Sequence, residues 1–588
     1  MWRSRSHLIT FITLFPRSSR YPCHNNGLAA MTAKQYYQSK STKRQKSASK
    51  LAKEGSNEEV LLFDVQSLLS RSELSRQVDD ERAKVGEKSD PINKYSPPER
   101  FSELEVRISE LSSTGDGLGL STTSDHVYVV PFTAPGDLVQ AKIVNYFPQA
   151  HYTLTDFVRV IEPGPHRDDA LIKCSYFAKC AGCQIQMLPY EAQLRHKKSI
   201  VEKAFRNFSS LTPEVIPAVG NTIGSPLQYG YRTKLTPHFD GPPGSMNRKA
   251  KREGSQRKGF TEVPPIGFMM KGTRKTIDIE DCPIGTDAVR EGIKVERKKI
   301  AEEISKYTRG ATILLRETTV RKPRHNSGSI APSSTAAQVH DEKATKEIEL
   351  PSDSTDGTST AELKIGIDGV PVDSVPYIEH KTYITDQRAI STEYVDGYEF
   401  KNTAGAFFQN NNSILPRFTA YIRDHIVPPS KCTDTLPLKY LIDAYCGSGL
   451  FTVTLSSLFV SSKGIDIAGA SIVSARENAI ANKISNASFM TADASQLFHE
   501  VTYPPEETVV IIDPPRKGCD DAFLQQLLSF GPQRVLYVSC NVHTQARDVG
   551  KLVEGVGDCR YEIESLQGFD FFPQTGHVEG VAVLSRSR

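Results

Sequence analysis

A cysteine at the end of an apolar stretch is a candidate nucleophile. Cys540 lies in the sequence Ser539-Cys540-Asn541, directly after residues 535–538, which predict a buried strand. In an α/β fold, the carboxyl ends of strands open into the crevice where ligands bind. A thiolate is a reactive nucleophile near neutral pH, although most free cysteines are small buried hydrophobic residues. Three other stretches of the chain favour the role of Cys540 as a catalytic nucleophile over that of a buried hydrophobic residue.

A glycine-containing turn follows another predicted strand. The strand begins near Tyr440, and the turn 445–449 contains two glycines, which let the backbone approach a ligand closely. About 20 residues further on, the next strand ends at Asp466, the position where a carboxylate binds ribose hydroxyls in nucleotide sites. A dinucleotide-binding fold is the alternative, but Thr452 occupies the position of its third glycine, which argues against it.

Two carboxylates lie at the ends of further stretches. Asp513 follows a fully apolar strand and precedes two prolines, which end the strand and fix a turn. Glu579 ends a loop that begins at Phe571, and it directly precedes a last predicted strand, 580–584. A thiol and carboxylates are the groups that nucleophilic and general-base catalysis require.

These stretches together resemble the RNA uracil-C5 methyltransferases, which use S-adenosylmethionine (AdoMet). The resemblance covers residues 393–588 and rests on three motifs in a fixed order. The motifs are Asp513-Pro514-Pro515-Arg516, Ser539-Cys540-Asn541 and Thr575-Gly576-His577-Val578-Glu579. The resemblance implies a Rossmann-like α/β catalytic domain with AdoMet as the methyl donor.

The resemblance also implies roles for single residues. Cys540 is expected to be the nucleophile and Glu579 the general base. Asp513 is expected to line the floor between the cofactor and uracil. The residues expected to bind the cofactor are Gln409, Tyr445, Asp466 and Asp513. The family often has glutamate where this chain has Asp466; the shorter aspartate keeps the charge.

The implied chemistry explains why these groups are needed. C5 of uracil is too weak a nucleophile to take a methyl group directly. A Cys540 thiolate added at C6 would make C5 enolate-like, so that C5 could attack the methyl group of AdoMet. Glu579 would then remove the C5 proton, and elimination would release the cysteine. A buried pyrimidine must leave its stack first, so we expect base flipping into an RNA cleft.

Four cysteines lie upstream of the catalytic motifs, and their spacing suggests a metal or cluster site. Cys174, Cys180 and Cys183 are clustered, and Cys282 stands far downstream. This set suits a thiolate-bound metal or cluster, but its spacing does not match two CxxC knuckles, so structural zinc is the second choice. The arrangement resembles the [4Fe–4S] site of the ribosomal-RNA branch of the same family. We therefore expect an iron–sulfur cluster, with zinc and no metal as the alternatives.

The length of 588 residues suggests three or four domains. Residues 1–95 are expected to be a disordered basic N-terminus that includes one amphipathic helix at 60–69. Short strands with Gly and Pro at 96–165 predict a small barrel, similar to the OB-like, RNA-binding TRAM domain. Residues 166–392 are expected to form an α+β central domain, interrupted by a disordered insertion at 322–362. Candidate base-stacking residues of the barrel are Tyr146, Phe147 and Tyr152.

Charge is distributed unevenly along the chain. Lys and Arg number 72 against 69 Asp and Glu, but residues 1–53 hold eleven Lys and Arg and no acid. RNA binding must therefore depend on local patches. A predicted helix at 189–208 leaves Lys197 on its outer face, and Arg232 and Lys234 are expected to contact the RNA backbone. The segment 247–258 is expected to be a mobile basic loop.

The first 30 residues resemble a mitochondrial presequence, because they contain arginine and serine but no acid. Their apolar run is too short to span a membrane, and no membrane partner is expected. We hypothesise two translation starts, Met1 for mitochondria and Met31 for the nucleus or cytosol. A plain disordered tail is the alternative.

The RNA substrate has two candidates. The presequence-like start and the insertions favour the T-loop uridine of tRNA, position 54, whereas the four cysteines favour ribosomal RNA. An RNA-folding factor, in which binding matters more than methylation, is the alternative from another class.

Overall fold

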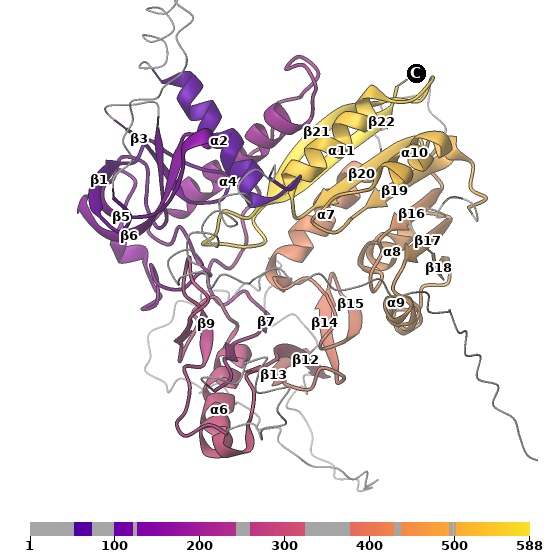
Figure 1. Cartoon of the computed structure of the whole chain (residues 1–588). Helices are drawn as coiled ribbons and strands as arrows, with labels where there is room; N and C mark the ends of the chain where they lie inside the picture. The colour runs from indigo at the N-terminus through magenta and orange to yellow at the C-terminus, as the bar shows by residue number, and fades with distance from the viewer. Residues whose placement is uncertain are drawn as a thin grey trace, which may run out of the picture. The chain divides into compact units, whose positions relative to one another are not determined.

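The computed structural model describes residues 52–72, 99–121, 126–242, 259–323, 377–427, 437–492, 498 and 501–587. Residues 53–588 form one compact unit (Figure 1). The presequence-like segment, the loop 247–258 and nearly all of the insertion 322–362 lie outside the described residues. Within the described part, no helix is both long and apolar enough to cross a membrane.

The expected β module is a six-stranded sheet with the order β1-β5-β6-β4-β3-β2. All pairs are antiparallel except β4 and β6. Irregular register between β5 and β6 bends these long strands. The strands are β1 (Glu103–Arg107), β2 (Glu110–Leu111), β3 (Gly117–Leu120), β4 (Val127–Val130), β5 (Leu138–Phe147) and β6 (Tyr152–Glu162).

The aromatic residues expected to stack on RNA bases make ring contacts within the module. The rings of Phe147 and Tyr152 stack on each other at 4.7 Å between centroids. Tyr152 is buried, and the ring of Tyr146 lies 5.2 Å from that of His126. Tyr152 is thus a packed residue of the module, whereas Tyr146 and Phe147 are only partly buried and base stacking by these two stays a prediction.

The amphipathic helix expected at 60–69 is present and longer than expected, so the region 1–95 is not disordered throughout. α2 (Asn57–Arg71) is capped by Ser56, whose Oγ accepts from Glu59 N, and the Glu59 side chain accepts from the backbone N of Gly55, the residue before the cap. Leu61, Val65 and Leu68 of this helix are buried in one cluster with apolar residues of the six-stranded sheet. Packing, rather than intrinsic helix propensity, therefore orders this segment.

The central region is built from helices and small sheets. α4 (Tyr190–Phe208) matches the helix expected at 189–208. Two antiparallel sheets have the orders β10-β9-β8-β11 and β13-β12-β7, and β14 pairs with β15 as a hairpin. The remaining elements are β7 (Lys234–Leu235), β8 (His238–Phe239), β9 (Gly267–Met269), β10 (Thr276–Asp278), α6 (Asp287–Glu303), β11 (Ala311–Thr312), β12 (Leu315–Pro323), β13 (Tyr377–Ile384), β14 (Ile390–Val395) and β15 (Tyr398–Thr403).

The C-terminal domain has the expected Rossmann-like fold. Its sheet has the order β18-β17-β16-β19-β20-β22-β21, and all pairs are parallel except those made by β22. Because both faces are covered, every residue of β19 and β20 is buried. The strands are β16 (Tyr440–Ala444), β17 (Ser461–Asp466), β18 (Ala487–Thr491), β19 (Thr508–Ile512), β20 (Arg534–Ser539), β21 (Tyr561–Phe569) and β22 (Glu579–Arg586).

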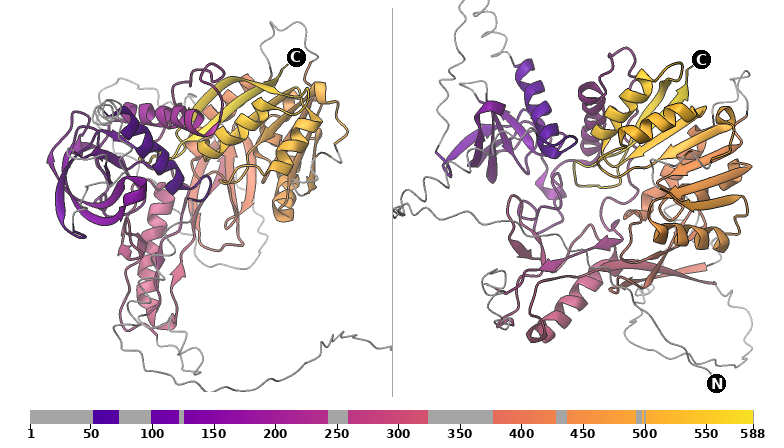
Figure 2. Two further views of the ribbon diagram at one scale, coloured as in Figure 1. Left: turned by 45° about the horizontal axis from the view of Figure 1, so that its top comes forward. Right: turned by 45° about the vertical axis from the view of Figure 1, so that its right-hand side comes forward.

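Helices cover both faces of this sheet (Figures 1 and 2). Residues of α4, α10 and α11 share one hydrophobic core with the sheet, and residues of α7, α8 and α9 share the other. The strand order reverses between β16 and β19, so a crevice is expected at their carboxyl ends. The helices are α7 (Leu415–Ile426), α8 (Leu450–Thr454), α9 (Gly469–Ala481), α10 (Asp521–Phe530) and α11 (Val542–Glu554).

Candidate active site

Strand register brings the expected nucleophile and base together. Ser539 at the end of β20 pairs with Gly580 in the antiparallel strand β22. Cys540 follows the first of these residues and Glu579 precedes the second, so both lie at the same edge of the sheet. Glu579 is 2% exposed and Cys540 is partly buried. The structure therefore places a thiol beside a buried carboxyl group.

Asp513 completes this group from the neighbouring strand. It directly follows β19, whose last residue, Ile512, pairs with Tyr537 of β20 and with Ala444 of β16. Burial raises the pKa of Asp513, and the carboxylate of Asp443 raises it further. The three expected residues thus converge because the carboxyl ends of β19 and β20 and the amino-terminal end of the antiparallel strand β22 lie at one edge of the sheet.

Burial holds the thiol and the carboxyl group in their neutral forms. It raises the pKa of Cys540 to about 12, and Glu579 and Asp513 add to the effect. Burial also raises the pKa of Glu579 well above its ordinary value, again with a contribution from Asp513. The Arg516 guanidinium opposes both shifts and hydrogen-bonds with the sulfur. The sequence assigned Arg516 no role beyond its place in a motif, and the structure adds its side chain to the site.

The loop that carries Arg516 is tied to the residue after the nucleophile. Asn541 caps α11 by accepting from His543 N, and its Nδ2 donates to Arg516 O at 2.9 Å. Thr544 Oγ1 donates to the same carbonyl at 3.2 Å. The start of α11 therefore fixes the backbone of the Arg516 turn relative to Cys540.

The glycine turn after β16 forms the second half of the site. Gly447 N donates to Asp466 Oδ2 at 3.0 Å, and Ala468 N donates to Oδ1 at 2.7 Å. Gly447 and Gly449 both have positive φ, and an added Cβ at Gly447 would meet nothing within 4 Å. The turn thus leaves room beside an oriented carboxylate. Ile467, 67% exposed, places an apolar side chain next to Asp466, and sequence reasoning did not single it out.

Thr452 explains why the third glycine is absent. Its Oγ1 donates to Asp443 Oδ2 at 2.6 Å, and its backbone N donates to the same oxygen at 2.9 Å. Burial raises the pKa of Asp443 to about 7. The Asp443–Thr452 contact fixes the start of α8 against β16, a structural role that glycine cannot perform.

The two other expected cofactor residues lie in different surroundings. Tyr445 has a left-handed backbone, with φ of 64°, and its ring packs 5.4 Å from that of Phe523 on α10. Gln409 is partly buried between two anchored neighbours. Phe408 packs on Phe400 at 5.6 Å, and Asn410 Oδ1 accepts from Arg316 Nη1 at 3.1 Å. The loop around Gln409 is therefore held in place from both sides.

Lys234 was expected to contact RNA phosphates but supports this same loop. Its Nζ donates to the carbonyl oxygens of Gly405 and Ala406, both at 3.1 Å. Arg232 Nε donates to Lys234 O at 3.1 Å. The Lys234 side chain thus supports the Gln409 loop, and since Arg232 and Lys234 are both only partly buried, contacts of either side chain to RNA stay a prediction.

Lys197, expected on the outer face of α4, is fully buried. It forms an ion pair with Asp570, and its Nζ donates to Phe572 O at 2.9 Å. Tyr190 OH donates to Asp570 Oδ2 at 3.0 Å. Asp570 begins the loop that leads to Glu579, so α4 fixes one end of that loop.

The middle of the same loop is held by glutamines of the central region. Gln193 Nε2 donates to Gln574 Oε1 at 3.0 Å, and Gln574 N donates back to Gln193 Oε1 at 3.1 Å. Gly576 N donates to Gln184 Oε1 at 3.0 Å. The position of the candidate base Glu579 therefore depends on residues of a different part of the chain.

The four cysteines are near one another. All are free thiols, and burial raises the pKa of Cys183 to about 12. The pKa of Cys282 is raised by burial and then by Cys183, Cys174 and Cys180, which places the four thiols within electrostatic range. Among the described residues, however, no three His, Cys, Asp or Glu side chains are arranged to hold a metal ion. The donor types suit a cluster, whereas the arrangement is not that of a preformed site.

Two family models match the chain. The tRNA (uracil-5-)-methyltransferase model matches residues 377–587, and the TRAM domain model matches residues 97–147. The tRNA (uracil(54)-C(5))-methyltransferase of Schizosaccharomyces pombe is 41% identical over 544 residues, which cover 92% of this chain and 85% of the relative. The protein of the same name from Saccharomyces cerevisiae is 38% identical over 550 residues, covering 90% and 81%.

A solved structure confirms the fold. The tRNA (uracil-54, C5)-methyltransferase of Pyrococcus abyssi, in complex with S-adenosyl-L-homocysteine, superimposes with a TM-score of 0.52 at 21% identity. The match covers 82% of this chain and 100% of the archaeal chain. The likeness therefore extends over most of the chain.

Proposed function

Because the chain belongs to the tRNA (uracil-5-)-methyltransferase family, we infer that it transfers a methyl group from AdoMet to C5 of uridine 54 in tRNA. The observation that carries this inference is the convergence of Cys540, Glu579 and Asp513 at one edge of the sheet. The two fungal relatives, which match about nine-tenths of the chain, support tRNA rather than ribosomal RNA.

We propose that the residues of the chain divide the chemistry as follows. Cys540 adds to C6 of the flipped uracil, and Glu579 removes the C5 proton before the cysteine is expelled. AdoMet, when bound, supplies the electrophilic methyl group. Arg516 favours the ionised forms of both Cys540 and Glu579 against the effect of burial.

Three further residues are proposed to bind the cofactor. Asp466 is oriented by Gly447 N and Ala468 N, and a carboxylate fixed in this way suits ribose hydroxyls. Gln409 and Tyr445 would contact AdoMet from the loop after β15 and from the turn after β16. Asp513 would lie between the cofactor and the uracil ring.

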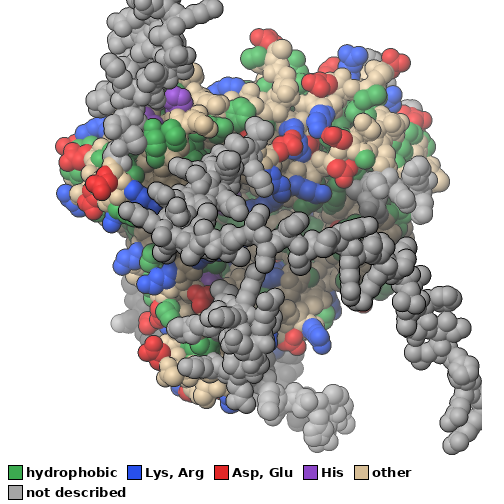
Figure 3. Space-filling view, viewed as in Figure 1, with side chains coloured by type: hydrophobic (Ala, Val, Ile, Leu, Met, Phe, Trp, Pro, Cys, Tyr) green, Lys and Arg blue, Asp and Glu red, His purple; other side chains and the backbone are tan. Residues whose placement is uncertain are grey.

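Charge over the surface supports contacts to RNA through local patches. In the view of Figure 3, Lys and Arg side chains lie among Asp and Glu side chains on the visible part of the described surface. Binding would then depend on the shape of the cleft and on scattered phosphate contacts, with a salt dependence.

The direct test of the function is methylation of defined RNA. Purified protein and AdoMet should form 5-methyluridine in an unmodified tRNA transcript, and no product should form when position 54 carries cytidine. A ribosomal-RNA fragment serves as the competing substrate. Methylation of the ribosomal fragment alone would contradict the tRNA assignment, and an effect on tRNA folding that survives in Cys540→Ala would favour an RNA-folding factor.

We also propose that Cys174, Cys180, Cys183 and Cys282 hold a [4Fe–4S] cluster. Four free thiols within electrostatic range support this proposal. Protein purified without oxygen should contain iron and acid-labile sulfide and absorb visible light, and Cys282→Ser should lose all three signals. Zinc without sulfide would instead indicate a structural zinc site, and the absence of both would overturn the proposal.

A final proposal concerns localisation. Translation from Met1 would direct the protein to mitochondria, and translation from Met31 would leave it in the nucleus or cytosol. The acid-free start of the chain supports this proposal. Fluorescently tagged proteins made from each start alone should occupy different compartments, and the same compartment for both would contradict it.

A further inference from the structure

A segment before the β module contacts the candidate active site. Residues 54–71, comprising Glu54, Gly55, the cap Ser56 and α2, lie outside both matched family models. We propose that this segment is a strap that positions the turn between Cys540 and α11 for methyl transfer. The inference rests on the proposed role of Cys540 as the nucleophile.

The amino-terminal end of the strap contacts the residue after the nucleophile. Gly55 O accepts from Asn541 Nδ2 at 3.3 Å, and the same nitrogen donates to Arg516 O at 2.9 Å. Glu54 pairs with Arg547 on α11 at 2.8 Å. The side-chain amide of Asn541 therefore joins three segments: the strap, the turn that contains Arg516, and the turn between Cys540 and α11, called here the Cys540 turn.

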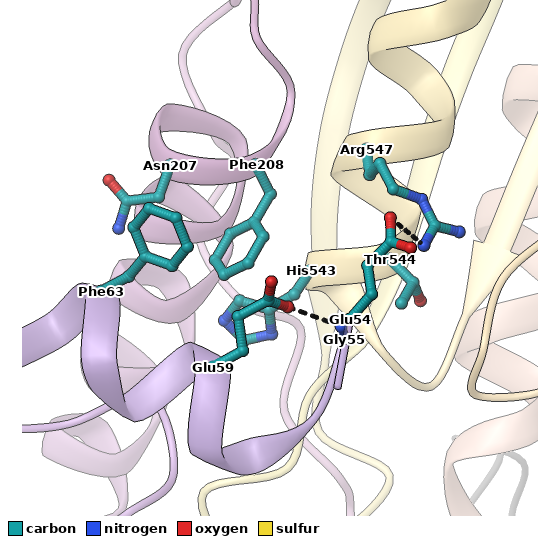
Figure 4. Close-up of a pocket in the computed structure, with 9 residues that line it drawn as sticks. All are labelled: Glu54, Gly55, Glu59, Phe63, Asn207, Phe208, His543, Thr544 and Arg547. Carbon is teal, nitrogen blue, oxygen red and sulfur yellow. Dashed lines mark hydrogen bonds and ion pairs between the residues drawn. The ribbon is translucent and has the colours of Figure 1, made fainter. Parts of the chain in front are cut away.

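The body of the strap is anchored on two other parts of the chain. Phe63 packs against Phe208 of α4, with 4.7 Å between ring centroids (Figure 4). Buried Asp64 accepts from Ser113 N at 2.5 Å and lies 3.7 Å from Lys203 Nζ. Because the helix is fixed to the β module and to α4, its amino-terminal end is presented to α11 in one position.

The contact between the strap and α11 depends on few groups. A cavity of about 170 Å³ separates them, lined by residues of the strap, α4 and α11 (Figure 4). The ring of His543 lies 5.1 Å from that of Phe208, and its buried Nε2 has no partner among the described residues. Since the interface is incompletely packed, a small change at Gly55 should separate the strap from α11.

Glycine is required at position 55 for two reasons. Its φ is +68°, and an added Cβ would lie 2.4 Å from Thr544 Cγ2. Gly557 offers a matched control, because its φ is +59° but an added Cβ would meet nothing within 4 Å. Gly55→Ala and Gly557→Ala therefore carry similar backbone strain, and only the first pushes against α11.

The experiment compares the two variants in the full-length protein. Amide hydrogen exchange across 57–71 reports whether the strap has separated. We expect faster exchange in Gly55→Ala only, with kcat lowered about tenfold or more, because small misplacement of a reacting group is costly. KM for AdoMet should stay unchanged, since the strap does not touch Asp466 or Gln409. A purely structural role would instead lower the melting temperature without this split between kcat and KM.

Phe63→Asp is the second variant, because it places a charge against Phe208 and separates the strap by another route. Faster exchange in the strap with wild-type kcat in either variant would overturn the proposal, as would an equal fall of kcat in Gly557→Ala. If the wild-type protein itself formed no 5-methyluridine, the proposed function would fail first. If the wild type and the variants with a separated strap methylated tRNA equally well, the proposed role of the strap would be refuted and the proposed function would stand.

Discussion

At the scale of single residues, Arg516 determines how readily the site ionises. Burial raises the pKa values of Cys540 and Glu579, and the guanidinium of Arg516 lowers both. Attack requires the thiolate, so the rate should increase with pH through the raised pKa of Cys540. Without Arg516 this pKa moves higher still, and the ionised fraction at neutral pH falls.

Arg516→Met should therefore shift the rising limb of the pH profile of kcat to higher pH and lower kcat at pH 7 by about tenfold, which corresponds to one pKa unit. The pH dependence of single-turnover methylation measures this shift. Arg516→Lys keeps the charge and should show a smaller displacement. An unchanged profile in Arg516→Met would show that another group controls ionisation.

Glu579→Gln should separate methyl transfer from release of the product. Cys540 can still add to C6 and C5 can still be methylated, but the C5 proton has no base to remove it. Turnover should fall by about 10²–10⁴-fold, and a covalent protein–tRNA complex should accumulate. A denaturing gel detects this complex, and Cys540→Ala should not form it. Wild-type turnover in Glu579→Gln would assign the base elsewhere.

At the scale of elements, α4 and the loop before β22 form a unit through one buried ion pair. Removing the Lys197 charge leaves Asp570 buried without its counter-charge, so Lys197→Met should cost about 3–5 kcal/mol of unfolding free energy. Urea unfolding measures this loss. Lys198→Met, on the next residue of the same helix but with an exposed hydrogen bond to Asn221, is the control and should change stability little.

The position of Lys197 also shows what the hydrophobic periodicity of a helix cannot predict, namely its contacts with distant parts of the chain. The apolar face of α4 was predicted from spacing, and the helix bounds were close to those observed. Its partner Asp570 lies 373 residues away, and no local pattern reveals such a contact. Cys540 and Asp513 were predictable because each follows an apolar strand and parallel strands end at a common edge, whereas Glu579, at the start of the antiparallel strand β22, was expected from the family resemblance.

At the scale of the whole molecule, two loops of the catalytic domain are positioned by other parts of the chain. The Cys540 turn contacts the strap, and the Glu579 loop is held by α4 and Gln184. The helix in the strap was expected over 60–69, but no local pattern indicates that it packs against the β module and α4. The sequence alone predicted the fold class but not these connections between domains.

The four-cysteine region is joined directly to the Glu579 loop. Cys183 precedes Gln184, whose side chain accepts from Gly576 N and whose backbone N donates to Gln574 O at 2.8 Å. Cys282→Ser should therefore lower the iron content and also accelerate hydrogen exchange of residues 570–578. Loss of iron with unchanged exchange in this loop would show that the two regions are independent.

The central claim is that Cys540 bonds to the uracil ring during methyl transfer. A tRNA with 5-fluorouridine at position 54 tests it directly, because fluorine at C5 cannot leave as a proton and the covalent complex should persist. After incubation with AdoMet and digestion, mass spectrometry should find the methylated, fluorinated nucleotide attached to the peptide that contains Cys540. Attachment to another residue, or no covalent complex while uridine 54 is still methylated, would contradict the account.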